Sequence, residues 1–279
     1  MPHDPSITTK NTSKSPFDSQ KLLPQVKHII AVSSGKGGVG KSTVATNLAL
    51  ALSKKYKVGL LDTDIYGPSI PRMMGALHQK PTLTGKNKIV PIVRFGIKLM
   101  SIGFLIEEGS AVVWRGPMLF KAIDQFLSDV TWDNLDYLVV DLPPGTGDVQ
   151  LSLAQKVKVS GAVVVSTPQN IALIDAKKAV DMWERVGVKV LGMVENMSYL
   201  LNPAGEKIQL FPKGDMDSYL ASKKITKLGE VAFNPAVSTA SEAGVPIVES
   251  HIQSEEAQAF LQIAEKISSA LPVDAEVSI

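Results

Sequence analysis

The chain has 279 residues, a formal net charge of +2 at pH 7 and no cysteine. Disulfides, zinc–thiolate sites and cysteine-ligated iron–sulfur clusters are therefore excluded, and the charge balance gives no reason to expect a nucleic acid or an anionic membrane as partner. No apolar stretch approaches the roughly 18 to 20 residues of a membrane span. The fractions of hydrophobic (44%) and charged (20%) residues are those of a globular protein with a substantial core.

The first residues of the chain are polar and rich in Ser, Thr, Lys and Pro. They lack the apolar centre of a signal peptide and the arginines of an organelle transit sequence, so we expect a disordered tail over residues 1–26 and a cytoplasmic protein. No linker or repeat divides the remainder. We expect one domain over residues 27–272 and a short C-terminal tail over 273–279.

Short β-branched runs alternate with helical stretches along the chain. Pro68 is well placed to be the first residue of a short helix, and Ser254 to cap the last one. The continuous apolar strands predict an α/β fold whose mostly parallel sheet is covered by helices on both faces. We expect strands at 28–33, 58–62, 137–141, 162–166 and 188–194, two more within 87–103 and a short one at 207–210, with helices at 41–53, 118–127, 172–186, 215–222 and 254–269.

Residues 35–42, here called the phosphate loop, read GKGGVGKS and fit the pattern G-x-x-x-x-G-K-[ST] between a strand and a helix. Glycines let backbone N–H groups surround a phosphate, and the helix N-terminus adds partial positive charge. Lys41 would reach the β- and γ-phosphates of ATP, Ser42 would ligate Mg²⁺ and Thr43 would bond the α-phosphate. The predicted ATP-binding residues are thus Gly35, Lys36, Gly37, Gly38, Val39, Gly40, Lys41, Ser42 and Thr43.

Three aspartates follow predicted buried strands. Asp141 ends the strand at 137–141, where a carboxylate that holds Mg²⁺ through a bound water belongs. Asp62 and Asp64 lie at the end of the strand at 58–62, beside the phosphate-loop strand in such a sheet. They would orient the attacking water and the water shell of the metal. The alternatives are a helix-capping role for Asp141 and turn roles for the other two.

Lys36 is a second lysine inside the phosphate loop. The chain has only four arginines, Arg72, Arg94, Arg115 and Arg185, so an arginine that neutralises the leaving phosphate is a poor expectation. A lysine this close to the phosphates cannot easily fold back on its own nucleotide. We therefore predict a homodimer that encloses two ATP molecules, with Lys36 catalytic in trans alongside Lys41, Asp62 and Asp64.

The phosphate loop is similar to the deviant Walker A motif of the MinD/ParA/nitrogenase-iron-protein class. Within that class, the blocks DTDIYGPS (62–69), WRGPM (114–118), DLPPGTGD (141–148) and ENMSY (195–199) resemble the Mrp/ApbC type of iron–sulfur cluster carrier ATPase. The match spans about residues 28–270. The resemblance implies a homodimer that binds and slowly hydrolyses ATP and delivers clusters to client apoproteins together with assembly proteins. It also implies that Asn196 contacts adenine; the alternative is that this residue only forms a turn at the end of its strand.

The chain departs from the family pattern after ENMSY. The family's Cys-x-x-Cys is replaced by LLNPAGE at 200–206, and Asp215 and Asp217 are hard oxygen ligands that fit a solvated helix start better than a cluster. We therefore expect no cysteine-ligated iron–sulfur cluster. The family's Ile-Pro-x-Asp loop reads VAFNP at 231–235, and the arginine expected soon after is replaced around residues 238–239, which alters the expected contacts to the base.

A ParA/MinD-like positioning ATPase that acts on membrane or DNA is the alternative. The membrane version needs a basic amphipathic C-terminal helix, but residues 254–279 contain a single lysine, Lys266, and several acids. The DNA version needs a dense basic patch, which the sequence does not nominate. A ligase or reductase component would need a further catalytic cluster. We therefore predict no membrane and no nucleic-acid partner.

Overall fold

The computed structural model describes residues 23–65, 67–85, 88–105 and 116–273. Four parts of the chain lie outside the described residues. They are residues 1–22 of the tail predicted over 1–26, Tyr66 of the DTDIYGPS block, Trp114 and Arg115 of the WRGPM block, and residues 274–279. Leu23 and Val26 belong to the hydrophobic core, so the described core begins a few residues before the predicted start of the domain at residue 27.

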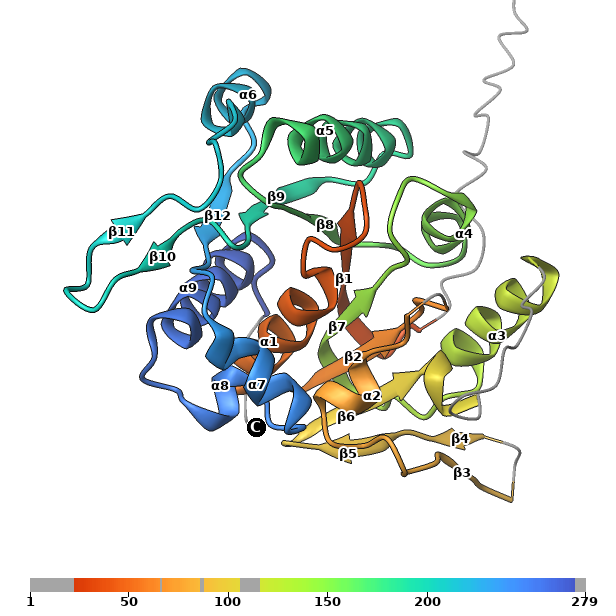
Figure 1. Ribbon diagram of the computed structural model, residues 1–279. Coiled ribbons are helices and arrows are strands. Elements are labelled where there is room, and N and C mark those ends of the chain that lie inside the picture. Colours follow the sequence, from red (N-terminus) through yellow and green to blue (C-terminus); the bar gives the residue numbers. More distant parts are fainter. Residues whose placement is uncertain (1–22, 66, 86–87, 106–115, 274–279) are drawn as a thin grey trace, which may run out of the picture.

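An eight-stranded sheet with the order β12-β9-β8-β1-β7-β2-β6-β5 forms the centre of the protein (Figure 1). All neighbouring strands run parallel except β5, which pairs antiparallel with β6 at one edge, so the predicted mostly parallel sheet is confirmed. Two short antiparallel pairs, β3 with β4 and β10 with β11, lie outside this sheet. The strands are β1 (Val26–Ser34), β2 (Val58–Asp62), β3 (Thr82–Leu83), β4 (Ile89–Val90), β5 (Ile92–Arg94), β6 (Ile97–Ser101), β7 (Leu135–Asp141), β8 (Gly161–Ser166), β9 (Val190–Glu195), β10 (Leu200–Leu201), β11 (Lys207–Ile208) and β12 (Lys227–Glu230).

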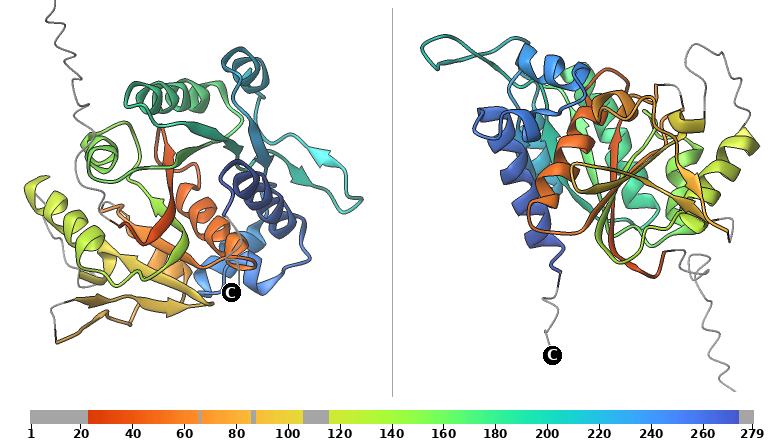
Figure 2. Two further views of the ribbon diagram at one scale, coloured as in Figure 1. Left: turned by 180° about the vertical axis from the view of Figure 1, so that it is seen from behind. Right: turned by 90° about the horizontal axis from the view of Figure 1, so that it is seen from below.

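Helices cover both faces of the sheet. Figures 1 and 2 show α1 and α9 together on one face and α4 and α5 on the other. None of the helices in the described ranges is long and apolar enough to cross a membrane. The helices are α1 (Lys41–Ser53), α2 (Ile70–Met73), the 3-10 turn η1 (Ile102–Leu105), α3 (Gly116–Ser128), α4 (Asp148–Lys156), α5 (Asn170–Arg185), α6 (Met216–Lys223), α7 (Pro235–Glu242), α8 (Ile247–Ser250) and α9 (Glu255–Ala270).

The central strands are apolar because both of their faces are covered. All five residues of β2 and all six of β8 are buried. Polar side chains therefore appear where these strands end, at one edge of the sheet. The register places Asp141 beside Val32 of β1 on one side and beside Asp62 of β2 on the other. This edge carries the phosphate loop, so the topology gathers the sequence motifs in one place.

Two contacts across the core fix the sheet ends relative to the helices. The buried Trp183 of α5 donates from Nε1 to Ser33 Oγ at 2.8 Å, directly before the phosphate loop. At the opposite end of the sheet, Tyr137 Oη donates to the carbonyl of Leu271, just after α9, at 2.6 Å. Buried indole and phenol groups usually find such a partner.

The local predictions were confirmed for most elements and wrong for the helix near Pro68. The short helix α2 begins at Ile70, and Pro71 rather than Pro68 occupies its first turn. The predicted cap of α9 is present, because Ser254 Oγ accepts the N–H of Ala257 at 3.2 Å. The helices α4, α7 and α8 were not predicted, and they are short. Asn234 caps α7, because its side chain accepts the N–H of Ala236, whereas neither α4 nor α8 has a side-chain cap.

Candidate functional site

The phosphate loop leaves β1 and enters α1 with the backbone its glycines allow. Gly38 and Gly40 have φ of 79° and 78°, in the left-handed region that favours glycine. Gly35 lies against α5 so closely that a Cβ there would meet the carbonyl oxygen of Asp175 at 2.0 Å. At Gly37 and Gly38 a Cβ would meet nothing within 4 Å, and both residues are exposed, so this part of the loop is accessible from solvent.

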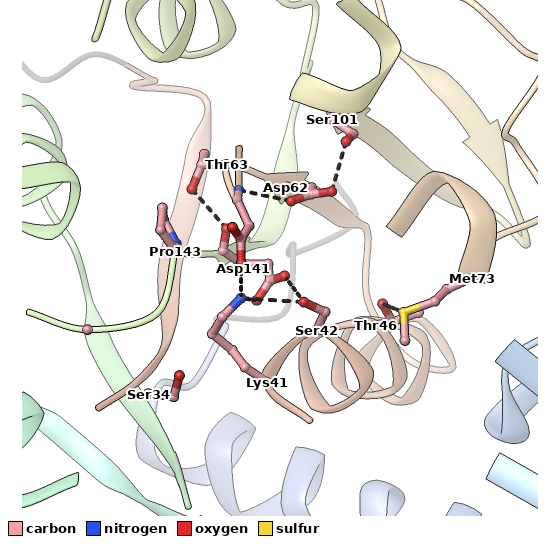
Figure 3. A network of polar contacts seen from close by, with 12 residues as sticks. Ser34, Lys41, Ser42, Thr46, Asp62, Thr63, Met73, Ser101, Asp141 and Pro143 are labelled. Atoms are coloured by element: carbon pink, nitrogen blue, oxygen red, sulfur yellow. Dashed lines mark hydrogen bonds and ion pairs between the residues drawn. The ribbon is translucent and has the colours of Figure 1, made fainter. Parts of the chain in front are cut away.

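Lys41 and Ser42 both point at Asp141, at the end of β7 (Figure 3). Lys41 Nζ lies 2.6 Å from Asp141 Oδ1, and Ser42 Oγ donates to Asp141 Oδ2 at 2.6 Å. Asp141 is fully buried and Lys41 is 6% exposed, so this is a desolvated ion pair. The structure therefore brings together the lysine, the serine and the aspartate that the sequence predicted.

The two aspartates after β2 occupy different places. Asp64 Oδ2 lies 3.4 Å from Lys41 Nζ, so it belongs to the same charged cluster. Asp62 points away from the phosphate loop: its Oδ2 accepts from Ser101 Oγ at 2.8 Å and its Oδ1 accepts the N–H of Asp64 at 3.0 Å. Ser101 ends β6 and was not predicted, because only the pairing of β6 with β2 brings it beside Asp62.

Burial and crowding of like charges alter the ionisation of this cluster. Burial, and then the charge of Asp141, raises the pKa of Asp62 to about 8. Burial also raises the pKa of Asp141, although Lys41 and Ser42 oppose that effect. Burial lowers the pKa of Lys41, but the charge and hydrogen bond of Asp141 outweigh it, so the net direction is upward. Lys41 thus remains an ammonium ion in the buried pair.

Other predicted residues take less obvious positions. Asn196 follows β9 and is 5% exposed; its Nδ2 donates to the carbonyl of Val39 in the phosphate loop at 2.9 Å. Its contact with adenine stays a prediction. Lys36 is half-buried and makes no ion pair with any side chain in the described ranges, which leaves its ammonium available.

Sequence reasoning missed the contacts that hold the loop after β7. Gln150 Nε2 donates to the carbonyls of Pro143 at 2.8 Å and Gly145 at 3.1 Å, and Thr63 Oγ1 donates to the carbonyl of Asp141 at 2.8 Å. These side chains fix the DLPPGTGD segment beside the phosphate loop. The only sequence feature that could have indicated these contacts is Gln150, a polar residue in the first turn of α4.

The segment that replaces the family's Cys-x-x-Cys forms the tip of the β10–β11 hairpin. Asn202 Oδ1 accepts the N–H groups of Ala204 and Glu206, each at 2.9 Å, and Asn202 Nδ2 donates to Glu206 Oε2 at 2.9 Å. The tip is therefore closed by its own side chains. Among the described residues no group of three or more His, Cys, Asp or Glu side chains could hold a metal ion, and the chain has no cysteine, so the donor set does not fit an iron–sulfur cluster.

A parallel sheet whose central strand opens into a phosphate loop, with a lysine and a serine on a strand-end aspartate, defines the class of P-loop NTPases. A family model described as NUBPL iron-transfer P-loop NTPase matches residues 25–268, and the chain belongs to this family.

Individual relatives agree with this assignment. The chain is 51% identical over 259 residues to the iron-sulfur cluster carrier protein of Aquifex aeolicus, covering 92% of this chain and 71% of that protein. It is 48% identical over 252 residues to the iron-sulfur cluster transfer protein NUBPL of Mus musculus, covering 89% of this chain and 79% of the relative.

Solved structures show the same fold. The nucleotide-binding protein in complex with ADP from Archaeoglobus fulgidus superimposes with a TM-score of 0.73 at 39% identity, covering 86% of this chain and 94% of that one. The cell division ATPase MinD of Pyrococcus furiosus gives a TM-score of 0.65 at 23% identity, covering 88% and 99% of the two chains. At that identity the second likeness concerns the fold alone.

Proposed function

We propose that this chain is an ATPase that binds Mg²⁺-ATP at the phosphate loop and hydrolyses it as a homodimer in the delivery of iron–sulfur clusters to client proteins. The observation that carries the proposal is the contact of Lys41 and Ser42, the last residues of a loop with exposed glycines, with the buried carboxylate of Asp141. The relatives' names support the cluster-delivery role, and the ADP complex of the Archaeoglobus protein supports a nucleotide as ligand.

The side chains that would hold Mg²⁺ are Ser42 and Asp141. Their oxygens already lie 2.6 Å apart and are the hard donors that this ion prefers. When bound, Mg²⁺ would neutralise charge on the β- and γ-phosphate oxygens. Lys41, which lies beside Asp141, would reach the β- and γ-phosphates. Asp64, next to Lys41, is the group placed to orient the attacking water.

Lys36 would complete the site of the facing subunit. Its ammonium has no ion pair within the described residues, and it lies beside the open glycines of the loop. A cation supplied in trans stabilises the charge that develops on the transferred phosphoryl group. The same charge within its own subunit is already provided by Lys41.

The cluster itself would be cargo, and this chain offers no thiolate to hold it. The chain contains no cysteine, and the hairpin tip is filled by the bonds of Asn202. The ligands must come from a client, an assembly protein or another molecule. The alternative of a membrane-positioning ATPase is disfavoured by α9, whose apolar residues Phe260, Ile263 and Ile267 are buried in the core.

The experiment compares three lysine variants. Lys41→Ala should abolish binding of Mg²⁺-ATP. Lys36→Ala should bind it like the wild type while hydrolysis falls by roughly a hundredfold or more, the order expected for loss of one charge that stabilises the transition state. Lys80→Ala, at an exposed position, is the control. Titration calorimetry and phosphate release give the two readouts.

Two results would contradict the proposal. Normal turnover by Lys36→Ala would remove the trans role of this lysine, and undiminished ATP binding by Lys41→Ala would place the nucleotide elsewhere. Sedimentation of the wild type with and without Mg²⁺-ATP tests the dimer directly, because the proposal requires a dimer when Mg²⁺-ATP is bound.

A further inference from the structure

The side chain of Asn196 is in direct contact with the phosphate loop. Its Nδ2 donates to the carbonyl of Val39 at 2.9 Å, and a Cβ on Gly40 would come within 2.2 Å of the same nitrogen. The amide therefore contacts the residues at which the loop turns into α1. Val39 and Asn196 are both buried, so this hydrogen bond has no competition from bulk water.

The backbone around Asn196 is fixed on both sides. Its N–H donates to the carbonyl of Ser166 at the end of β8, at 2.8 Å. The next residue, Met197, has φ of 54°, an uncommon conformation for a side chain of this size, and it places Met197 Cε 3.4 Å from a Cβ on Gly40. The segment is thus held in one conformation against the loop.

The preceding residue, Glu195, anchors this segment from the sheet interior. Its side chain is 1% exposed; Oε1 accepts from Ser198 Oγ, and Oε2 forms an ion pair with Lys227 Nζ at 3.1 Å. A buried carboxylate that loses its cation is strongly destabilised, so the position of Glu195 depends on Lys227.

Lys227 lies at the edge of the sheet, far along the chain from the phosphate loop. It is 22% exposed and also pairs with Asp217 at 3.0 Å and with Glu230. It lines a cavity of about 440 Å³ between the β10–β11 hairpin, β12 and α9. A continuous path of contacts therefore leads from this cavity through Lys227, Glu195 and Asn196 to the carbonyl of Val39.

We infer that Asn196 and Glu195 are positioning residues of the phosphate loop and that Lys227 holds them in place from the sheet edge. The inference rests on the proposed binding of Mg²⁺-ATP at that loop. Asn196 keeps the carbonyl of Val39 turned inward, which leaves the loop N–H groups facing the phosphates. Its role then concerns the phosphate chain and not the base.

Nucleotide selectivity separates this role from an adenine contact. Asn196→Ala should weaken Mg²⁺-ATP, Mg²⁺-GTP and Mg²⁺-tripolyphosphate alike, by roughly three- to tenfold, the value of one hydrogen bond. Weaker ATP binding with unchanged tripolyphosphate binding would overturn the inference in favour of a base contact. Circular dichroism checks that the variant folds; if it does not, the Lys227 variants below decide.

The lysine variants test the path from the sheet edge. Lys227→Met should weaken binding of Mg²⁺-tripolyphosphate, and Lys227→Arg should restore it, because arginine can renew the ion pair with Glu195. Lys213→Met is the matched control: Lys213 lies 3.4 Å from Asp217 and 4.0 Å from Glu230, and it forms no ion pair with Glu195.

The outcomes distinguish the inference from the proposed function. Equal effects of Lys227→Met and Lys213→Met would show that only surface charge matters and would overturn the path. If the wild type binds Mg²⁺-ATP and the variants bind it equally well, the inference is overturned and the proposed function is not. A wild type without measurable binding of Mg²⁺-ATP would instead remove the proposed function.

Discussion

At the scale of single residues, burial determines which carboxyl groups of the site are ionised. Asp62 and Asp141 face each other across β2 and β7, both fully buried, with Lys41 as the cation nearest to Asp141. Two buried carboxylates and one ammonium cannot all be charged without cost. Lys41 bonds Asp141 and not Asp62, so we expect the extra proton on Asp62, whose pKa burial raises to about 8.

The proton on Asp62 gives the stability of the protein a pH dependence. Below pH 4 the carboxyl is protonated in both the folded and the unfolded chain; its folded pKa is about 8 against an ordinary value of 3.8. The stability that comes from the preferred proton is therefore present at low pH and is lost as the pH rises through about 8. Asp62→Asn keeps the neutral side chain at every pH.

We therefore expect Asp62→Asn to gain stability relative to the wild type between pH 5 and pH 8. Thermal unfolding in EDTA without nucleotide measures the difference at each pH. The exposed acid Asp181 provides a control, since Asp181→Asn should change little across the same range. A constant difference between wild type and Asp62→Asn would show that the carboxyl is already ionised in the folded state.

At the scale of elements, the start of the phosphate loop packs tightly against α5. Gly35 approaches the backbone of Asp175, and Trp183 of the same helix bonds Ser33 of β1. The helix therefore determines where the loop begins. A neighbouring glycine, Gly37, has open space around it.

Substituting Gly35 and Gly37 in turn should show whether close packing or loss of backbone flexibility determines the cost of adding a side chain to this loop. Gly35→Ala places a Cβ 2.0 Å from a carbonyl oxygen, so the loop or α5 must shift, and we expect a loss of about 1–3 kcal/mol of unfolding free energy. Gly37→Ala should lose less than about 1 kcal/mol, because the added methyl group meets no atom. Urea unfolding gives both values; equal losses would contradict the packing argument.

Element positions were predictable where the signal was local. The strands ending in Asp62 and Asp141 and the helix after Gly40 follow from apolar runs and glycine spacing, and they agree with the structure. Pro68 was assigned to the wrong turn because Pro71 lies close by and fits the same rule. The preference for proline in the first turn of a helix is met by both Pro68 and Pro71, so it does not fix where this helix begins.

Contacts between distant elements were beyond sequence reasoning. The bonds from Asn196 to Val39 and from Trp183 to Ser33 join residues 157 and 150 positions apart, and neither side chain type dictates its partner. Ser101 reaches Asp62 only through the order of β6 and β2 in the sheet. The sequence motifs therefore predicted which residues form the site, whereas the neighbours of these residues depend on the order of the strands in the sheet.

At the scale of the whole molecule, this chain belongs to an iron-transfer family but contains no cysteine and hence no thiolate. Anaerobic reconstitution with iron and sulfide should therefore give no visible absorption of a cysteine-ligated cluster. An Asn202→Cys, Gly205→Cys variant on the same hairpin is the informative comparison, since it introduces two thiols. Stoichiometric cluster uptake by the wild type would show that oxygen or external ligands suffice.

The two ends of the described core meet on one side of the molecule. His28 Nε2 contacts the carbonyl of Pro272 at 2.9 Å, and Tyr137 Oη holds Leu271 close by, at the opposite end of β1 from the phosphate loop. Fluorophores, affinity tags or surface tethers joined at either end of this core would therefore leave the nucleotide face free. A circular permutant that joins these ends should keep the sheet intact, which makes the molecule suitable for single-molecule measurements with both attachment points on one side.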